Sequence, residues 1–172
     1  MIRFFAGVVA TLVVVAVAAF AAVEFGLLPA GADVHPGKLE RWAANRSLDA
    51  AIAREAPPPP YPFGPPTDAT FVAGAKLYMA NCAVCLGSGA APETMIASGQ
   101  YVRPPQFAKH GVDDDPAGET YWKIEHGIRF TGMPSYAGAL TEQQIWQITY
   151  FLGVPSDKLP APAAAIWNTK PN

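Results

Sequence analysis

The chain has 172 residues, of which 51% are hydrophobic and 15% are charged, and its formal net charge is −2. A balance of this kind offers no basic surface to a nucleic acid, so the composition argues against a nucleic-acid-binding protein. The length allows one small domain beside other segments.

Residues 1–25 predict a transmembrane anchor. Phe4 to Val23 is an uncharged run long enough to cross a hydrocarbon core of about 30 Å as a helix. Arg3 before it favours a cytoplasmic N-terminus and an exported remainder. Small-residue patterns such as AVA at 16–18 leave a cleaved signal peptide as the alternative. We expect a single-pass protein of the bacterial inner membrane, with a soluble part in the periplasm.

Residues 26–66 predict a periplasmic stem. The charge pattern favours one surface helix from about Gly37 to Ala56, with four apolar residues roughly on one side: Leu39, Trp42, Leu48 and Ile52. Residues 54–66 are dominated by proline, which no helix tolerates in its interior. This stretch is expected to be an extended spacer that holds the following part away from the membrane by up to about 3 Å per residue.

Residues 67–154 predict one helical domain. Its first helix has Asp68 as the expected N-cap and one apolar face, formed by Phe71, Ala75 and Tyr78. No stretch has the pattern of a useful strand, so we expect an all-α fold.

Two more helices follow in this domain. One begins at the aspartates 113–115, which complement the helix dipole, and ends at Gly127. The other opens with a capping box from Thr141 to Gln144 and closes at Gly153, with an apolar face of Ile145, Ile148 and Leu152. Residues 155–172, rich in Pro and Ala, are expected to wrap around the domain or to trail from it.

The only two cysteines, Cys82 and Cys85, stand at the end of the first domain helix in "ANCAVCLGSGA". In an exported chain such a pair tends to be oxidised or covalently occupied. A Cys-x-x-Cys pair followed by histidine would be a c-type haem attachment site, but the following residue here is Leu86.

These motifs together resemble the class I c-type cytochromes of the small bacterial kind. The resemblance rests on Cys-x-x-Cys-x-Gly after the first helix, "TGMPSYAG" at 131–138 and "LTEQQIWQITYFL" at the last helix. It implies three main helices around a haem pocket, preceded here by a transmembrane helix. It also implies one haem c, with thioether bonds to Cys82 and Cys85 and with Met133 as an axial iron ligand.

Leu86 departs from that family pattern, because leucine has no lone pair with which to bind iron. The attachment machinery of the family is expected to recognise the histidine too, so the departure bears on covalent attachment as well as on ligation. His35, His110 and His126 are expected to be surface or capping residues rather than replacement ligands.

The resemblance implies an electron carrier, not an enzyme, that works between periplasmic or membrane redox proteins. One alternative is a haem-deficient structural or assembly subunit in which Cys82 and Cys85 form a disulfide. Another is a haem enzyme with an open iron position, although the sequence supplies no obvious acid/base pair for it. A thiol oxidoreductase is disfavoured, since a thioredoxin-type pair starts a helix after a strand whereas this one closes a helix.

Overall fold

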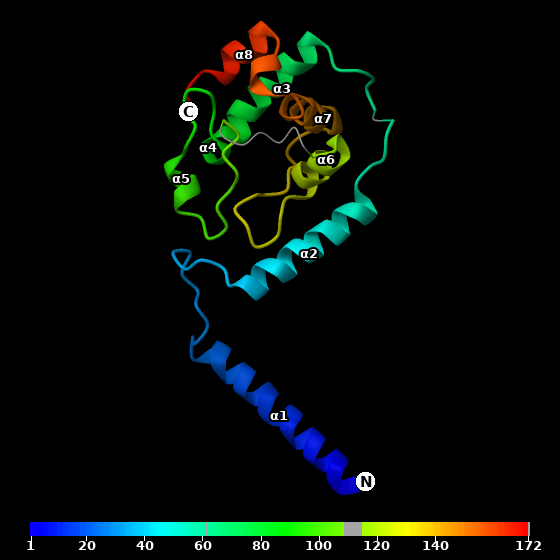
Figure 1. The fold of residues 1–172 in the computed structure, drawn as a ribbon, viewed down its shortest axis with the longest axis vertical. Coiled ribbons are helices and arrows are strands. Elements are labelled where there is room, and N and C mark those ends of the chain that lie inside the picture. The colour runs from blue at the N-terminus through cyan, green and yellow to red at the C-terminus, as the bar shows by residue number, and fades with distance from the viewer. Residues whose placement is uncertain (61, 109–114, 172) are drawn as a thin grey trace. The chain divides into compact units, whose positions relative to one another are not determined.

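The computed structural model describes residues 1–60, 62–108 and 115–171. Its helices, in chain order, are α1 (Ile2–Glu24), α2 (Lys38–Glu55), α3 (Asp68–Asn81), α4 (Ala83–Leu86), α5 (Met95–Ser98), α6 (Ala117–His126), α7 (Glu142–Leu152), the 3-10 turn η1 (Ser156–Lys158) and α8 (Ala161–Trp167) (Figure 1). None of the described residues forms a strand; one isolated bridge pairs Ser88 with Ala91. The predicted all-α fold is therefore confirmed. The chain divides into two units, residues 1–34 and residues 35–172.

The first unit is built on α1, which is long and apolar enough to cross a membrane. None of its 23 residues is buried against other parts of the protein. An apolar helix that is not buried against protein is typical of a segment that lies in an apolar solvent such as a bilayer. The helix therefore agrees with the predicted anchor.

In the second unit, α3 begins one residue earlier than the sequence suggests. Thr67, in an extended conformation, accepts a hydrogen bond from the Thr70 amide at 3.3 Å, and the Thr70 hydroxyl accepts one from the Thr67 amide at 3.2 Å. The prediction of Asp68 as N-cap is wrong, because Asp68 is already the first helical residue. There its carboxylate complements the helix dipole instead of capping an amide.

The predicted boundaries of α7 and the predicted end of α6 agree with the structure, whereas α6 begins at Ala117, two residues after the last of the aspartates expected at its start. Thr141 and Gln144 form the expected capping box, and α7 is capped at its other end by Gly153. Gly127 ends α6 in a left-handed conformation, with φ of 68°. Of the three aspartates expected at the start of α6, Asp115 is ion-paired with Lys123 at 2.6 Å, and residues 113 and 114 lie outside the described part.

Helices α3 and α7 pack closely and separate two apolar clusters. The first cluster contains Ala75, Tyr78, Ala83, Phe151, Ala163 and Trp167. The second contains Tyr121, Ile124, Ile145, Trp146 and Ile148. Phe71, Ala75 and Tyr78 contribute to the first cluster as the helical pattern predicts, and the buried Ile145 and Ile148 contribute to the second.

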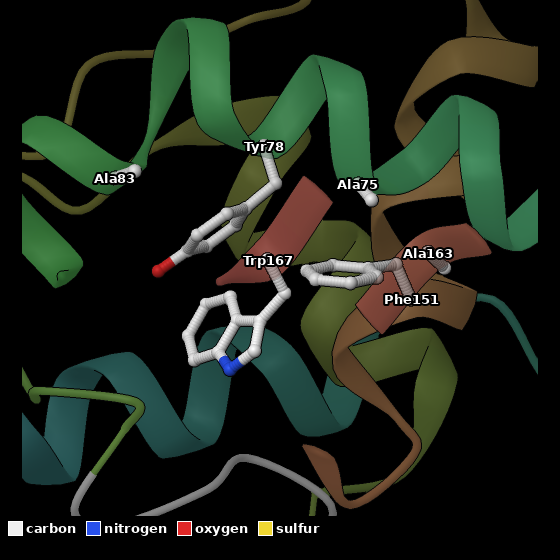
Figure 2. Close-up of a cluster of buried hydrophobic side chains, with 6 residues drawn as sticks. All are labelled: Ala75, Tyr78, Ala83, Phe151, Ala163 and Trp167. Atoms are coloured by element: carbon white, nitrogen blue, oxygen red, sulfur yellow. The ribbon is translucent and has the colours of Figure 1, made fainter. Parts of the chain in front are cut away.

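The C-terminal segment is part of the first cluster. Helix α8 packs on α3 and buries Trp167, whose ring centroid lies 5.5 Å from that of Tyr78 and 6.0 Å from that of Phe151 (Figure 2). Behind it, the Thr169 carbonyl accepts a hydrogen bond from Ser88 at 2.8 Å. Of the two expectations for residues 155–172, the structure therefore selects wrapping around the domain.

The stem helix also packs on the domain. Helix α2 lies against α6, where Ile52 is buried and the Trp122 indole donates to Glu55 at 3.2 Å. The four apolar residues of this helix do not share one side: Ile52 and half-buried Leu48 face the domain, whereas Leu39 and Trp42 are exposed. The single apolar stripe predicted for this helix is therefore wrong, because the residues fall on opposite faces at about 100° per residue.

The Pro-rich segment that follows α2 touches the domain as well. The Tyr150 hydroxyl on α7 donates to the Pro62 carbonyl at 3.3 Å and lies 3.5 Å from the Gly64 carbonyl. Together with α7, Phe63 and Pro66 line a shallow pocket. The predicted extended spacer therefore contacts the domain at α7, and its role in holding the domain away from a membrane stays a prediction.

We expect Ile52→Ala to lower the free energy of unfolding of this unit by about 2–4 kcal/mol, because it removes the one buried side chain of α2. Leu39→Ala is the matched control: Leu39 lies on the same helix but is 76% exposed, so its truncation changes stability by less than about 0.5 kcal/mol. Thermal unfolding of the full chain, followed by near-UV circular dichroism, measures both. Equal stability of the two variants would show that α2 does not pack on the domain.

Candidate functional site

The cysteine pair lies in a single helical turn at the end of α3. Cys82 joins α3 to α4, and the amides of Cys85 and Leu86 both donate to the Cys82 carbonyl, at 3.1 and 3.0 Å. Residues three apart on a helix are neighbours, with Cβ atoms about 5–6 Å apart, so both sulfurs belong to one small area. The two cysteines are free thiols, and the disulfide expected for a haem-deficient chain is not formed in this structure.

Gly87 closes this turn, and no other residue fits its place. Its φ is 80°, and a Cβ there would lie 2.8 Å from the Ala91 carbonyl oxygen. The buried Tyr78 hydroxyl donates to the Gly87 carbonyl at 2.7 Å. The turn is therefore fixed both by its own conformation and by the first apolar cluster.

Two glutamine side chains from the segment after α5 donate hydrogen bonds to Cys85. Gln106, which is only 5% exposed, donates to the Cys85 carbonyl at 2.9 Å. Gln100 donates to the Cys85 sulfur at 3.4 Å, within range for a weak sulfur acceptor. The Phe107 amide donates to the Leu86 carbonyl at 3.0 Å, so the segment from Gln100 to Phe107 lies along the motif.

The predicted methionine ligand stands in a tight loop. The Ile128 amide donates to the Met133 carbonyl at 3.2 Å, and the Thr131 hydroxyl accepts from the Met133 amide at 3.1 Å. A Cβ at Gly127 would lie 2.6 Å from the carbonyl carbon of Pro134, so the loop packs against the end of α6. These bonds fix the backbone from which the thioether projects.

Two contacts bring this loop to the cysteine turn. The Tyr136 hydroxyl donates to the Asn81 carbonyl at 2.9 Å, next to Cys82. The Gln100 amide that touches Cys85 also lies against Gly132, where an added Cβ would collide with it. The structure therefore brings together the segments that carry all three predicted site residues.

Leu86 and Met133 pack against different clusters. Leu86 and Cys82 are partly buried against the first apolar cluster, whereas Met133 and Tyr136 are partly buried against the second. The two side chains therefore belong to different parts of the core.

Burial dominates the electrostatics of the site. It raises the pKa of the Cys82 thiol to about 12, and the nearby Cys85 adds to the shift. Burial also raises the pKa of the Tyr136 phenol to about 12, with smaller contributions from both cysteines. Cys82 is thus a protonated, weakly nucleophilic thiol at neutral pH, which is unlike the activated cysteine of a thiol oxidoreductase.

The described histidines lie before α2 and at the end of α6. The His126 ring stacks on Trp122 with centroids 4.7 Å apart, and its Nδ1 lies 3.2 Å from the Trp122 carbonyl oxygen. His35 precedes α2 and is exposed, and His110 lies outside the described residues. Within the described ranges no group of three or more His, Cys, Asp or Glu side chains gathers as a metal site.

The domain thus has a Cys-x-x-Cys turn after α3 and a methionine loop between α6 and α7. Residues 69–152 match the family model of the cytochrome c oxidase, cbb3-type, subunit III. The match supports the cytochrome c family for this domain, and with it haem c binding and electron transfer in general. No curated protein and no solved structure matches the chain.

Sequence reasoning missed Gln100 and Gln106, which hold the cysteine turn. The only signal for Gln106 is the local "RPPQF" at 103–107, where two prolines confine the backbone before a polar residue, and no motif marks Gln100. It also missed the bond from Tyr136 to Asn81, since nothing in the sequence indicates which carbonyl a tyrosine hydroxyl will reach.

Proposed function

We propose that this protein is a membrane-tethered c-type cytochrome that carries electrons between periplasmic redox partners. The observation that carries the proposal is the junction of the Met133 loop with the cysteine turn, through the 2.9 Å bond from Tyr136 to Asn81. This junction supports the proposal because it joins the segment that carries the thioether to the segment that carries the two thiols. When bound, a haem c supplies one-electron chemistry, and the protein supplies its position and surroundings.

The residues present fit this cofactor in part. Cys82 and Cys85 are neighbouring free thiols on one helical turn, as two thioether bonds require. Met133 is a suitable axial donor, because thioether sulfur binds haem iron and raises its reduction potential. Leu86 does not fit the opposite axial position, since its side chain has no donor atom.

The proposed location is the bacterial inner membrane, with α1 as a single-pass anchor and the rest of the chain in the periplasm. The apolar length of α1 and the position of Arg3 before it support this orientation. The proposed organisation is an anchor at 1–25, a stem at 26–66, a cytochrome domain at 67–154 and a C-terminal segment at 155–172.

The proposed partners are membrane or periplasmic redox proteins. The matched family is named for a subunit of a terminal oxidase, so a respiratory complex is the kind of partner we propose. A haem-deficient structural subunit receives no support from the family match.

The test is to measure covalently bound haem in the full chain, produced with a bacterial haem-attachment system. We expect haem that survives acid-acetone extraction and gives a thioether-type pyridine haemochrome spectrum. The Cys82→Ala and Cys85→Ala double variant should lose it. A native chain without covalent haem would overturn the proposed electron carrier.

A further inference from the structure

Helix α2 presents a face that the domain does not cover. Three residues define the covered side. Glu40 accepts a hydrogen bond from the Tyr101 hydroxyl at 2.6 Å, Glu55 accepts one from the Trp122 indole, and Ile52 is only 4% exposed. At about 100° per residue these positions share one side of the helix. The opposite side at the N-terminal end of α2 carries Leu39, Trp42 and Arg46, with Lys38 at its margin, and we call these four residues the outer face.

The composition of the outer face is that of an interfacial helix. Trp42 is 64% exposed and Leu39 is 76% exposed, so both side chains expose apolar surface to solvent. Lys38 and Arg46 beside them are exposed, and none of the ion pairs found among the described residues involves either of them. Tryptophan and long basic side chains prefer the boundary between lipid headgroups and acyl chains.

The acidic side chain in the same turns is turned away. Glu40 could oppose the basic residues, but its carboxylate is engaged by Tyr101 on the domain side. The two charged residues of the outer face, Lys38 and Arg46, are therefore both positive and complement the anionic headgroups of a membrane surface; the exposed Asp49 follows on the same side of the helix, three residues after Arg46.

The length of the connection limits how far the outer face can lie from a bilayer that α1 crosses. Residues 25–37 join α1 to α2, and at about 3.4 Å per residue they can span no more than about 45 Å. Three of the large apolar side chains in this connection, Phe25, Leu27 and Leu28, are exposed as well.

We propose that the outer face of α2 lies on the surface of the membrane that α1 crosses, with Trp42 and Leu39 in the interfacial layer and Lys38 and Arg46 at the headgroups. This inference rests on the proposed anchor. Because α2 is fixed to α6 through Ile52 and Glu55, lipid contact of α2 limits which face of the domain can meet a partner.

The test uses tryptophan emission, because the chain has four tryptophans and only Trp42 is exposed. The full chain is placed in nanodiscs of equal parts phosphatidylcholine and phosphatidylglycerol, with or without bromine atoms near the carboxyl end of the acyl chains. Bromine quenches only tryptophans that reach the lipid, and comparing the two discs for each protein cancels any other quenching.

We expect brominated lipid to lower the tryptophan emission of the native protein. The loss should be no larger than the emission of Trp42, which is the difference in emission between the native protein and Trp42→Phe. Trp42→Phe itself should show no bromine quenching, and Trp122→Phe, which changes a buried tryptophan facing α2, should keep the native loss. Native protein without quenching, the result if the outer face instead binds a protein partner, would overturn the proposal. So would quenching that persists in Trp42→Phe.

Failure of the anchor gives a different result. If α1 does not insert, the protein does not copurify with the nanodiscs, and neither the proposed tether nor the lipid contact stands. Copurification without bromine quenching leaves the tether in place and overturns only the lipid contact. Covalent haem content, measured on the same samples, reports separately on the electron carrier.

Discussion

Leu86→His is expected to raise covalent haem several-fold, toward one haem per chain, and to produce a six-coordinate low-spin spectrum. Histidine supplies the lone pair that leucine lacks, and it completes the Cys-x-x-Cys-His pattern at Cys82 and Cys85. The backbone of residue 86 is fixed by hydrogen bonds at its amide and its carbonyl, so the new side chain starts from the same place. Haem per chain, from the pyridine haemochrome, and the visible spectrum of the purified chain measure the effect.

Leu86→Asn separates ligation from polarity. Asparagine is close to leucine in size and is polar, but its amide is a poor iron ligand, so haem content and spin state should stay at the native values. A second variant, Met133→Ala together with Leu86→His, should keep the added haem and lose the low-spin spectrum if Met133 is the other axial ligand. If Leu86→His and Leu86→Asn gave the same haem content and spectrum, position 86 would have no part in ligation.

Trp167→Ala is expected to be strongly destabilising, with a loss of about 3–5 kcal/mol in the free energy of unfolding. The side chain is 6% exposed and packs with Tyr78 and Phe151 in the first apolar cluster (Figure 2). Its removal leaves a cavity beside the residue that holds Gly87. The expected fall in melting temperature, about 10–20 °C, can be followed by near-UV circular dichroism of the full chain.

Trp42→Ala is the matched control, because the same side chain is removed from an exposed position on α2. Measured in detergent, it should change stability by less than about 0.5 kcal/mol. A Trp167→Ala variant as stable as Trp42→Ala would mean that α8 is not part of the folded core.

Local signals predicted the helices of the domain well. The capping box at Thr141 and the glycines after α6 and α7 act within one or two turns, so the sequence alone contains them. The N-cap of α3 was misplaced by one residue because Thr67 and Asp68 are both good caps, and the choice depends on which backbone is extended.

Long-range packing could not be predicted in the same way. The burial of Trp167 depends on its meeting Tyr78, far away in the sequence, and an Ala- and Pro-rich segment gives no sign of that partner. The contact of the Pro-rich stretch with the domain is of the same kind: its composition indicates stiffness, whereas its bond to the Tyr150 hydroxyl on α7 joins residues 88 positions apart. The residues predicted for the site came from a motif, but their meeting depends on Tyr136 and Gln100, which no motif includes.

The hydrogen bonds between the end of the chain and the cysteine turn set an order of assembly. The Gly89 amide donates to the Trp167 carbonyl at 3.0 Å, and Ser88 donates to the Thr169 carbonyl. Thr169 stands 81 positions after Ser88, so the segment after Cys85 cannot complete these bonds until α8 has been synthesised. Before that point the turn that carries Cys82 and Cys85 lacks its contacts with residues 167–169.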